Sequence, residues 1–440
     1  MVRRIAVISE HASPLCALGG VDSGGQNVYV AEVSRHLARM GHEVDVFTRR
    51  DDAKLPQVVN WLDGVRVIHV DAGPPEFVRK EDLLAFMPAF TGRMAAFCRR
   101  HGRYDLVHAN FWMSGLVAAE IKKLMGIPFV VTFHALGRVR RQFQKEADEF
   151  PDERFEIEDR VIAAADAVVA ECPQDKQDLI ELYDAEPAKL RIIPCGFDAE
   201  ELWPIAKAEA RRHLRIGGMD PLVLQLGRMV PRKGVETVVR GFGKLLWEHK
   251  VRARLLVVGG ESEDPDPAAT PEIARLQSIA AEEGVANAVT FTGRRSREEL
   301  RYYYSAADVF VTTPWYEPFG ITPLEAMACG TPVVGSAVGG VKYTVRHGET
   351  GYLVPPRDPD ALAARLARLL CDEETLTLLA ENALRRVNEQ FTWQRVAWLV
   401  AGLYEDVLRP KTPKTAREEL LHVQSAMDTT MQKLDLPWAA

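Results

Sequence analysis

The sequence predicts an α/β protein with two doubly wound parallel sheets, one in each half of the chain, that face each other across a cleft. Three observations lead to this prediction. Short Val/Ile-rich runs alternate with amphipathic helical patterns, the same alternation appears in both halves, and Pro and Gly interrupt it between them. The runs are apolar at consecutive positions, as expected for strands covered by helices on both faces. With 440 residues, the chain is long enough for two or three domains.

The expected elements follow in order along the chain. The first half contains strand-like runs at 4–10, 42–50, 65–71, 104–110, 129–134, 166–172 and 190–196. The helix between the first two is indicated by apolar residues spaced at three and four positions, with Gly41 at its C-terminal end: Val30, Val33, Leu37 and Met40. The second half contains runs at 222–227, 253–260, 289–293, 308–313, 331–335 and 351–354, helices at 234–248 and 271–283, and a solvent loop at 261–271.

The domain boundary is expected between residues 195 and 207, where Pro194, Gly196 and Pro204 break the pattern. The expected organisation is an N-terminal domain at 1–195, a C-terminal domain at 196–390, an amphipathic helix at 391–408 and a tail at 409–440. The tail contains a further helical stretch at 415–434 that the pattern does not place. Ligands of parallel α/β sheets bind at the carboxyl ends of the strands, so the site is expected in the cleft. Closure of the cleft would bend the chain at 195–197.

The composition argues against several other classes of protein. The net charge of −7 is not that of a general nucleic-acid-binding protein. The six cysteines are scattered, without a CxxC pair or a Cys/His cluster, which argues against a zinc site. No apolar signal core and no run of membrane-spanning length is apparent, so a cytoplasmic location is expected. The acidic pairs at 264/266 and 358/360 flank prolines and are expected to be turns, so no metal or other cofactor is predicted.

The strongest chemical signal is the segment 317–325 (EPFGITPLE), in which two glutamates are eight residues apart. Thr322, Pro323 and Glu325 match the N-cap, N1 and N3 positions of a helix that follows a strand. A helix N-terminus presents unpaired N–H groups and the positive end of a dipole, so it suits a phosphate. In the structural alternative Glu325 only closes a capping box, which leaves Glu317 unexplained.

Two glycine-rich loops occupy equivalent strand–helix junctions in the two halves. The loop at 19–27 (GGVDSGGQN) lets backbone N–H groups approach a ligand closely. In the loop at 227–234 (GRMVPRKG), Arg228 offers a planar guanidinium fork and Lys233 a point charge for phosphate oxygens. The alternatives are that the first loop is a flexible surface loop and that the two charged side chains of the second loop are only solvated. His134 ends a strand-like run, where the pattern is compatible with either a structural or a cleft-facing role.

Together these features resemble glycosyltransferase family 4, a group of retaining enzymes with the GT-B fold. Four motifs match in order and spacing: Gly-Gly-Gln-Asn at 24–27, Phe-His at 133–134, Gly-Arg-x4-Lys-Gly at 227–234 and E-x7-E at 317–325. The resemblance covers residues 4–408 and implies two Rossmann-like domains, with the helix at 391–408 returning to the N-terminal one. The first loop is similar to that of sucrose-phosphate synthases, mannosylfructose-phosphate synthases and inositol-phosphate N-acetylglucosaminyltransferases.

The resemblance also implies roles for residues on the donor side. Arg228 and Lys233 would hold the diphosphate of a nucleotide sugar. Glu325 would bind the ribose, and Glu317 would lie near the hydroxyl groups of the sugar. His134 would border the sugar and complete the catalytic set. Further donor contacts are implied for glycines of the first loop, for backbone N–H groups at the helix start and for an arginine near the base: Gly24, Gly25, Phe319, Gly320, Ile321, Thr322 and Arg294.

On the acceptor side, the resemblance implies contacts from Gln26, Asn27 and His134. Relatives with a phosphorylated acceptor clamp its phosphate with a lysine near the third strand and an arginine on a later helix. The residues in these places are Lys80 and Arg154, with Arg138 as a further candidate. Such relatives have Ser or Thr after the histidine, whereas this chain has Ala135. Either the acceptor is held differently or it lacks a phosphate, and Lys80 has the alternative of a solvated charge.

The function that the resemblance implies is transfer of a hexose from a nucleotide sugar such as UDP-glucose to fructose 6-phosphate or a similar small acceptor. Same-face attack with retention is expected, and Glu317 as a covalent nucleophile is the alternative. Inositol phosphate, a free sugar or a lipid-linked acceptor stays open, the last because the basic run at 138–141 would suit an anionic surface. A sugar-nucleotide epimerase and a non-catalytic binding protein also stay open. A dehydrogenase is disfavoured because the GxGxxG fingerprint is missing. No oligomeric state is predicted.

Overall fold

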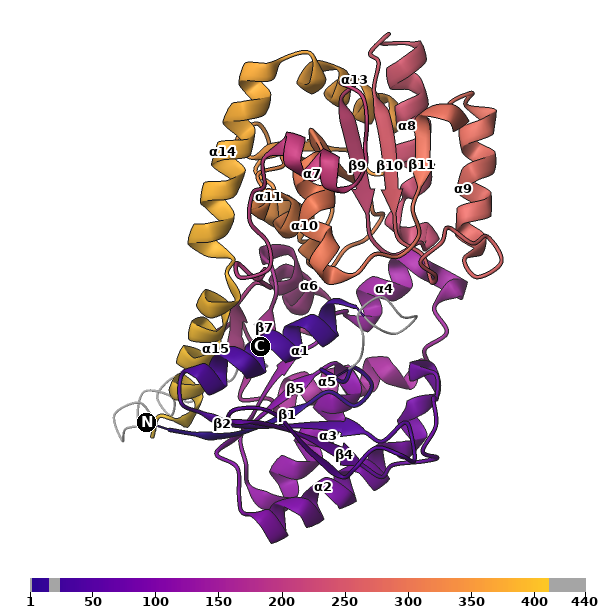
Figure 1. The fold of residues 1–440 in the computed structure, drawn as a ribbon. Coiled ribbons are helices and arrows are strands. Elements are labelled where there is room, and N and C mark those ends of the chain that lie inside the picture. The colour runs from indigo at the N-terminus through magenta and orange to yellow at the C-terminus, as the bar shows by residue number, and fades with distance from the viewer. Residues whose placement is uncertain (1, 16–23, 411–440) are drawn as a thin grey trace, which may run out of the picture.

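The computed structural model describes residues 2–15 and 24–410, which form two α/β domains stacked one above the other (Figure 1). Each domain is a mainly or wholly parallel sheet flanked by helices, which is the GT-B arrangement implied by the resemblance. The predicted helix at 415–434 and residues 19–23 of the first glycine-rich loop lie outside the described residues.

The N-terminal domain contains an eight-stranded sheet in the order β3-β4-β2-β1-β5-β6-β7-β8. All strands but β3 lie in predicted runs and pair in parallel: β1 (Arg4–Ile8), β2 (Glu43–Arg49), β4 (Val65–Val70), β5 (Leu106–Asn110), β6 (Phe129–Thr132), β7 (Ala167–Ala170) and β8 (Leu190–Ile192). The sequence did not predict β3 (Val58–Leu62), which pairs antiparallel with β4 at the sheet edge. None of its residues is fully buried, so β3 lacks the apolar run that marks a covered strand.

The C-terminal domain contains a six-stranded parallel sheet in the order β11-β10-β9-β12-β13-β14. Its strands overlap the predicted runs: β9 (Leu222–Leu226), β10 (Arg254–Val258), β11 (Val289–Phe291), β12 (Val309–Thr312), β13 (Val333–Ser336) and β14 (Gly351–Val354). In each sheet the chain changes sides once, between β1 and β5 and between β9 and β12. Such switch points leave a crevice at the carboxyl ends of the strands, where α/β proteins bind ligands.

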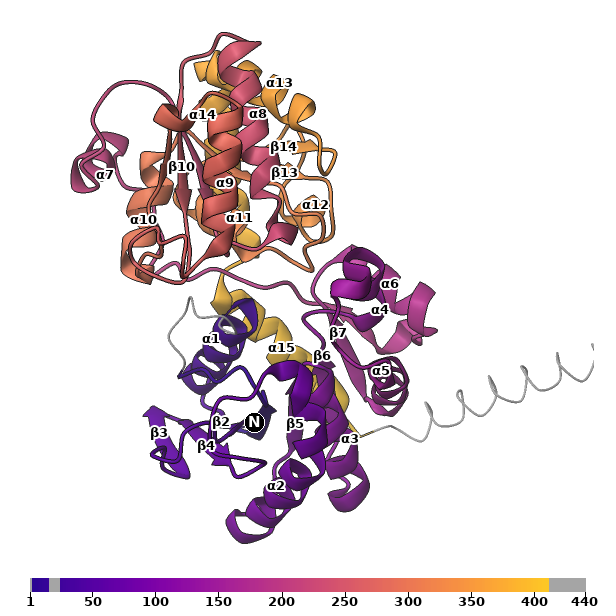
Figure 2. The ribbon, with the colours of Figure 1, turned by 90° about the vertical axis from the view of Figure 1, so that its right-hand side faces the viewer.

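Helices separate the strands. The N-terminal domain has α1 (Gly25–Arg39), η1 (Lys80–Phe86), α2 (Met87–His101), α3 (Trp112–Met125), α4 (Gly137–Gln144), η2 (Lys145–Ala147), α5 (Glu153–Ala164), α6 (Pro173–Tyr183) and η3 (Pro187–Lys189). The rest of the described chain has α7 (Lys207–His213), η4 (Pro231–Lys233), α8 (Val235–Trp247), α9 (Pro271–Glu282), η5 (Ala286–Ala288), α10 (Arg297–Ala306), α11 (Ile321–Ala328), α12 (Val341–Thr344), α13 (Pro359–Leu370), α14 (Glu373–Gln390) and α15 (Trp393–Leu408). Figure 2 shows α1 and α4 on the side of the N-terminal domain that faces the C-terminal domain.

The chain crosses between the domains twice, and the two crossings are hydrogen-bonded to each other. The Phe197 N–H donates to the carbonyl oxygen of Phe391 (2.9 Å), and the Trp393 N–H donates to that of Phe197 (3.2 Å). After the second crossing, α15 lies along α1 on the N-terminal domain (Figure 1). Its Tyr404 hydroxyl is 2.7 Å from His108 Nδ1 in β5. The last described helix therefore belongs to the core of the first domain, as the GT-B fold implies.

Candidate active site

A cavity of about 430 Å³ lies between the domains and is lined by residues of both. The residues expected on the donor side all line it: Gly24, Gly25, Arg228, Lys233, Arg294, Glu317, Phe319, Gly320, Ile321, Thr322 and Glu325. Of the residues expected on the acceptor side, Gln26, Asn27, Lys80 and His134 line the same cavity. The structure therefore brings all four sequence motifs together at one place.

Two helices begin at this cavity, one from each domain. α1 begins at Gly25 and α11 begins at Ile321, and both residues line the cavity. A Cβ atom built on Gly25 would lie 3.4 Å from Ile321 Cδ1, and one built on Gly24 would lie 3.9 Å from Arg228 Nη1. The two helix N-termini and the Arg228 guanidinium therefore concentrate positive potential in a small volume, which suits a diphosphate.

The start of α11 differs from the prediction. The helix begins at Ile321 with Gly320 as its N-cap residue at φ +88°, so the prediction that Thr322 is the N-cap is wrong. Glycine adopts this φ without steric cost, and the turn into the helix therefore comes earlier than the Thr-Pro pattern indicates.

Glu325 does not close a capping box. Its Oε2 accepts a hydrogen bond from the Tyr304 hydroxyl (2.8 Å), and its Oε1 is 4.0 Å from Arg297 Nη1. Both partners belong to α10. The Glu325 carboxylate is thus held at the cavity wall by a neighbouring helix, which the local sequence pattern could not indicate.

Lys233 and Glu317 form a largely buried ion pair between Nζ and Oε2, with side chains that are 18% and 12% exposed. Burial raises the pKa of Glu317, but the positive charges of Lys233, Arg232 and Arg228 outweigh burial and hold this pKa below its usual value. The carboxylate is therefore ionised at neutral pH. Burial lowers the pKa of Lys233, and its interaction with Glu317 opposes this effect. The pair fixes the ends of two motifs, 227–234 and 317–325, at one point of the cavity wall.

The loop at 317–320 packs closely against two glycines that sequence analysis missed. The Gly340 N–H donates to the Glu317 carbonyl oxygen (3.1 Å). A Cβ atom on Gly340 would lie 2.4 Å from Phe319 Cα, and one on Gly339, at φ +41°, would lie 2.0 Å from the Glu317 carbonyl oxygen. Only glycine fits at these positions. The Gly-Gly pair in the loop that follows a predicted strand was the available signal.

We expect Gly340→Ala to lower kcat/KM about 100-fold, because the new methyl group displaces the loop that carries Glu317 and the backbone of Phe319, and misplacement by about 1 Å is enough for such a loss. The measurement is steady-state kinetics together with circular dichroism, which reports whether the fold is retained. Gly402→Ala in α15 is the matched control, since no atom lies within 4 Å of a Cβ there. If folded Gly340→Ala has the wild-type kcat/KM, Gly340 is not needed to position the loop at 317–320.

His134 lines the cavity and is held there by several neighbours. It is a non-glycine residue with φ +58°. Its Nδ1 is 2.9 Å from Glu171 Oε1 and its Nε2 is 3.0 Å from Asn110 Oδ1. Its ring also packs edge-on against Tyr29, with centroids 4.9 Å apart. With both ring nitrogens occupied by protein oxygens, the ring is placed to shape the site rather than to accept a proton from a substrate.

Two of the residues expected to bind an acceptor phosphate, Arg138 and Arg154, do not line the cavity. Arg138 forms a two-point ion pair with Asp159, with both N–O distances at 2.6 Å. Arg154 is fully buried, with Nε 2.7 Å from Glu158 Oε1. The structure therefore corrects the expectation that either arginine contacts the acceptor directly. Lys80 lines the cavity and lies 3.9 Å from Glu81.

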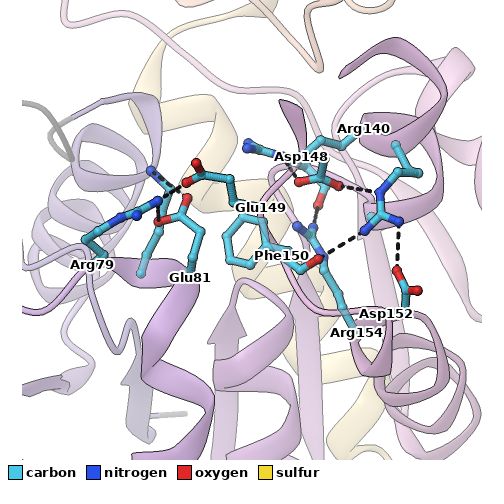
Figure 3. Close-up of polar contacts among 12 residues, drawn as sticks. Arg79, Glu81, Arg140, Asp148, Glu149, Phe150, Asp152 and Arg154 are labelled. Carbon is cyan, nitrogen blue, oxygen red and sulfur yellow. Dashed lines mark hydrogen bonds and ion pairs between the residues drawn. The ribbon is translucent and has the colours of Figure 1, made fainter. Parts of the chain in front are cut away.

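The basic run at 138–141 is not an open patch for an anionic surface. Arg140 and Arg141 both donate to the Asp148 carboxylate, with N–O distances of 2.7 and 3.2 Å, and Arg141 also pairs with Asp152 at 2.7 Å (Figure 3). Intramolecular carboxylates thus compensate these charges. The partners follow several residues after the run and were not predictable from it.

Several lining residues were missed by the sequence analysis. They include Arg140, Gln144, Phe150, Arg232, Arg297 and Tyr316. Tyr316 stacks on Phe143 of α4, with ring centroids 5.3 Å apart, and so joins the C-terminal domain to the N-terminal one. Aromatic residues at such positions look like core residues in the sequence, because only the domain pairing brings them to a cavity.

Within residues 2–15 and 24–410, no three His, Cys, Asp or Glu side chains are grouped so that they could hold a metal ion. No helix in this part of the chain is long and apolar enough to cross a membrane.

Comparison with known proteins gives matches over most of the chain. Residues 23–201 match the model of "Glycosyltransferase Family 4", and residues 206–386 match that of "Glycosyl transferases group 1". A D-inositol 3-phosphate glycosyltransferase from Corynebacterium jeikeium is 37% identical over 409 residues, which are 92% of this chain and 97% of that protein. A structure of sucrose-phosphate synthase from Thermosynechococcus elongatus is 36% identical with a TM-score of 0.84, and covers 92% of this chain and 99% of that one. Anabaena HepE in complex with UDP-glucose is 19% identical with a TM-score of 0.72 over 92% of this chain and 100% of that one, a likeness of fold alone.

Proposed function

The chain belongs to glycosyltransferase family 4 and is a glycosyltransferase of the GT-B fold, and from this premise we propose that it transfers a hexose from a nucleoside-diphosphate sugar to a small polyhydroxylated acceptor with retention of anomeric configuration. The observation that carries the proposal is the meeting of two helix N-termini with Arg228 and Lys233 at one cavity. This arrangement suits the diphosphate of a donor. The same cavity extends to Lys80 and Gln26, which gives an acceptor a place beside the donor.

Transfer breaks the bond between the sugar C1 and the diphosphate oxygen, and negative charge grows on the leaving diphosphate. Arg228, Lys233 and the N-terminus of α11 are positioned to stabilise that charge. The acceptor hydroxyl attacks C1 on the face from which the diphosphate departs, and its proton passes to the leaving phosphate oxygen. The products are a glycoside and a nucleoside diphosphate.

Glu317 has a different role in this proposal from that of a covalent nucleophile. Its carboxylate is ionised and engaged by Lys233 Nζ, and it is almost completely buried. An engaged carboxylate of this kind suits hydrogen bonds from the hydroxyl groups of the donor sugar better than attack on C1. Arg228, Arg232 and Lys233 supply positive charge beside the donor diphosphate, so we propose that turnover needs no divalent metal.

The donor that we propose is UDP-glucose, and the acceptor is a sugar or cyclitol phosphate. Two specific acceptors have support of nearly equal weight. Sucrose-phosphate synthase, at 36% identity, favours fructose 6-phosphate, and D-inositol 3-phosphate glycosyltransferase, at 37% identity, favours inositol 3-phosphate. Ala135 and the covered Arg154 leave Lys80 as the expected phosphate contact that lines the cavity, so each phosphorylated acceptor is to be compared with its unphosphorylated form.

The test begins with thermal stabilisation by UDP, GDP, ADP and their glucose conjugates in buffer that contains EDTA. Turnover of the stabilising donor is then measured with fructose 6-phosphate, inositol 3-phosphate, fructose and inositol, and the anomeric configuration of the product is determined by NMR. We expect stabilisation by UDP-glucose and a retained product with one of the phosphorylated acceptors. An inverted product would overturn the retaining mechanism, and loss of turnover in EDTA would overturn the proposal that no metal is needed.

A further inference from the structure

The two oxygens of the Glu325 carboxylate have different surroundings. Oε2 accepts a hydrogen bond from the Tyr304 hydroxyl at 2.8 Å. Oε1 lies 4.0 Å from Arg297 Nη1, which is too far for a hydrogen bond. Glu325 and Arg297 both line the cavity, and Oε1 accepts no hydrogen bond from any of residues 2–15 and 24–410. This oxygen is therefore available to a hydroxyl group of a ligand.

The Arg297 guanidinium is held by a glutamate that does not itself line the cavity. Arg297 Nε donates to Glu201 Oε2, and Glu201 lies just after the first crossing between the domains. The Glu201 N–H donates to the carbonyl oxygen of Asp198 (3.2 Å). The Asp198 carboxylate is buried and lies 3.6 Å from Arg35 of α1. The crossing thus positions Glu201, and Glu201 in turn fixes one side of the guanidinium.

More than one carboxylate attracts this guanidinium. Burial lowers the pKa of Arg297, but the negative charges of Glu325, Glu201 and Glu32 outweigh burial and raise it. Glu32 of α1 is already engaged by Arg35, at 3.1 Å. If Glu201 no longer held the guanidinium, we would therefore expect it to turn toward Glu325. A shift of Nη1 by about 1 Å would be enough to form a charge-assisted hydrogen bond, which would occupy Oε1.

We propose that Glu201 is a positioning residue for the nucleotide: it keeps the Arg297 guanidinium away from Glu325 Oε1, so that this oxygen can accept a hydrogen bond from a hydroxyl group of the nucleotide. The inference rests on the proposed function in one respect, namely that a nucleotide occupies this cavity. Glu201 acts through Arg297 and does not touch the ligand. Its loss therefore weakens nucleotide binding, because the guanidinium then competes with the ligand for the same oxygen.

The first test is a crystal structure of Glu201→Gln without any ligand. We expect Arg297 Nη1 to lie within about 3.2 Å of Glu325 Oε1 in this variant. Glu200→Gln is the matched control, because Glu200 is the preceding residue of the same crossing, does not line the cavity and pairs with Arg39 at 3.2 Å. In the control, Arg297 is expected to keep its wild-type position. If Arg297 also keeps that position in Glu201→Gln, the positioning role is overturned.

The second test is the affinity for UDP, measured by calorimetry. We expect Glu201→Gln to raise the Kd about 10-fold, the effect of losing one hydrogen bond to a charged group, and Glu200→Gln to leave it within about twofold. In an Arg297→Gln background, Glu201→Gln is expected to have no further effect, because the guanidinium that it controls is absent. An equal loss of affinity in both backgrounds would show that Glu201 does not act through Arg297, and would overturn the proposal.

The third test asks whether the lost contact is made by a hydroxyl group. The hydroxyl groups of the UDP nucleoside are those of its ribose, so 2′,3′-dideoxy-UDP is the matched probe. The wild type is expected to bind UDP more tightly than this analogue, and Glu201→Gln is expected to lose most of that preference. A displaced Arg297 with an unchanged Kd for UDP would overturn the role in nucleotide binding. If the wild type binds no nucleotide, the proposed function fails, whereas the crystal structures still decide whether Glu201 holds the guanidinium away from Glu325.

Discussion

Lys233→Met is expected to lower kcat/KM by about 100- to 1000-fold and to destabilise the fold by about 3–5 kcal/mol. In the proposed mechanism Lys233 contributes positive charge beside the donor diphosphate, and in the structure it also compensates the buried Glu317 carboxylate. Methionine retains much of the apolar stem but leaves that carboxylate without its main partner. The Glu317 pKa is then expected to rise, because burial raises it and Lys233 is the largest of the charges that lower it. Kinetics with UDP-glucose and urea unfolding would measure the two effects.

The double variant Lys233→Met/Glu317→Gln separates stability from catalysis. With the buried charge removed, most of the lost stability is expected to return, since removal of both members of a buried pair costs less than removal of one. Activity is expected to remain low because the positive charge beside the diphosphate is still missing. If the double variant is as active as the wild type, Lys233 has no electrostatic role in transfer. If Lys233→Met unfolds at the wild-type urea concentration, the ion pair does not contribute to stability.

The second large effect is expected from Arg228→Ala, with a fall in kcat/KM of about 100- to 1000-fold. The guanidinium lies against Gly24 of the opposite domain, at the point where α1 and α11 begin. In the proposed mechanism, its removal takes away charge that stabilises the leaving diphosphate, and it also removes the approach of this guanidinium to Gly24 across the cavity. Arg228 is only partly buried, so the melting temperature without ligand is expected to change little.

Arg228→Lys is the companion variant for this prediction. Lysine retains the charge but not the two-point fork, so only a small part of the lost activity is expected to return. The affinity for UDP, measured by calorimetry, is expected to fall in both variants and to depend less steeply on salt than in the wild type. Wild-type affinity for UDP in Arg228→Ala would place the diphosphate elsewhere in the cavity.

The sequence predicted the strands that are covered on both faces, because burial on both sides leaves a continuous apolar run such as that of β9. It did not predict β3, whose residues are half-exposed at a sheet edge. The motif residues that line the cavity could be grouped in advance because they follow strands, and the carboxyl ends of parallel strands are brought together by the fold itself. At these positions the local sequence pattern and the sheet topology both place the residue at the cavity.

The errors concern side chains whose neighbours are distant in sequence. Arg154 was expected to face the acceptor, but Phe111 and Phe150 enclose it. Thr322 was expected to cap α11, but Gly320, two residues earlier, allows an earlier start. The support given by Gly340 to the Phe319 backbone depends on a close approach of two loops that no local pattern encodes. Packing between segments, rather than secondary structure, decided each of these cases.

The return of α15 to the N-terminal domain has a consequence for biosynthesis. Residues of α1 and the buried His108 of β5 are covered by α15, and Arg3 pairs with Glu405 at 3.0 Å. When the ribosome has made the first domain, this surface still lacks its cover, and it stays so until the whole second domain has emerged. The second domain, by contrast, draws all its strands from one continuous stretch, β9 to β14. The domain that is synthesised first is therefore completed last, and its uncovered apolar face is the part of the nascent chain that chaperones would have to protect.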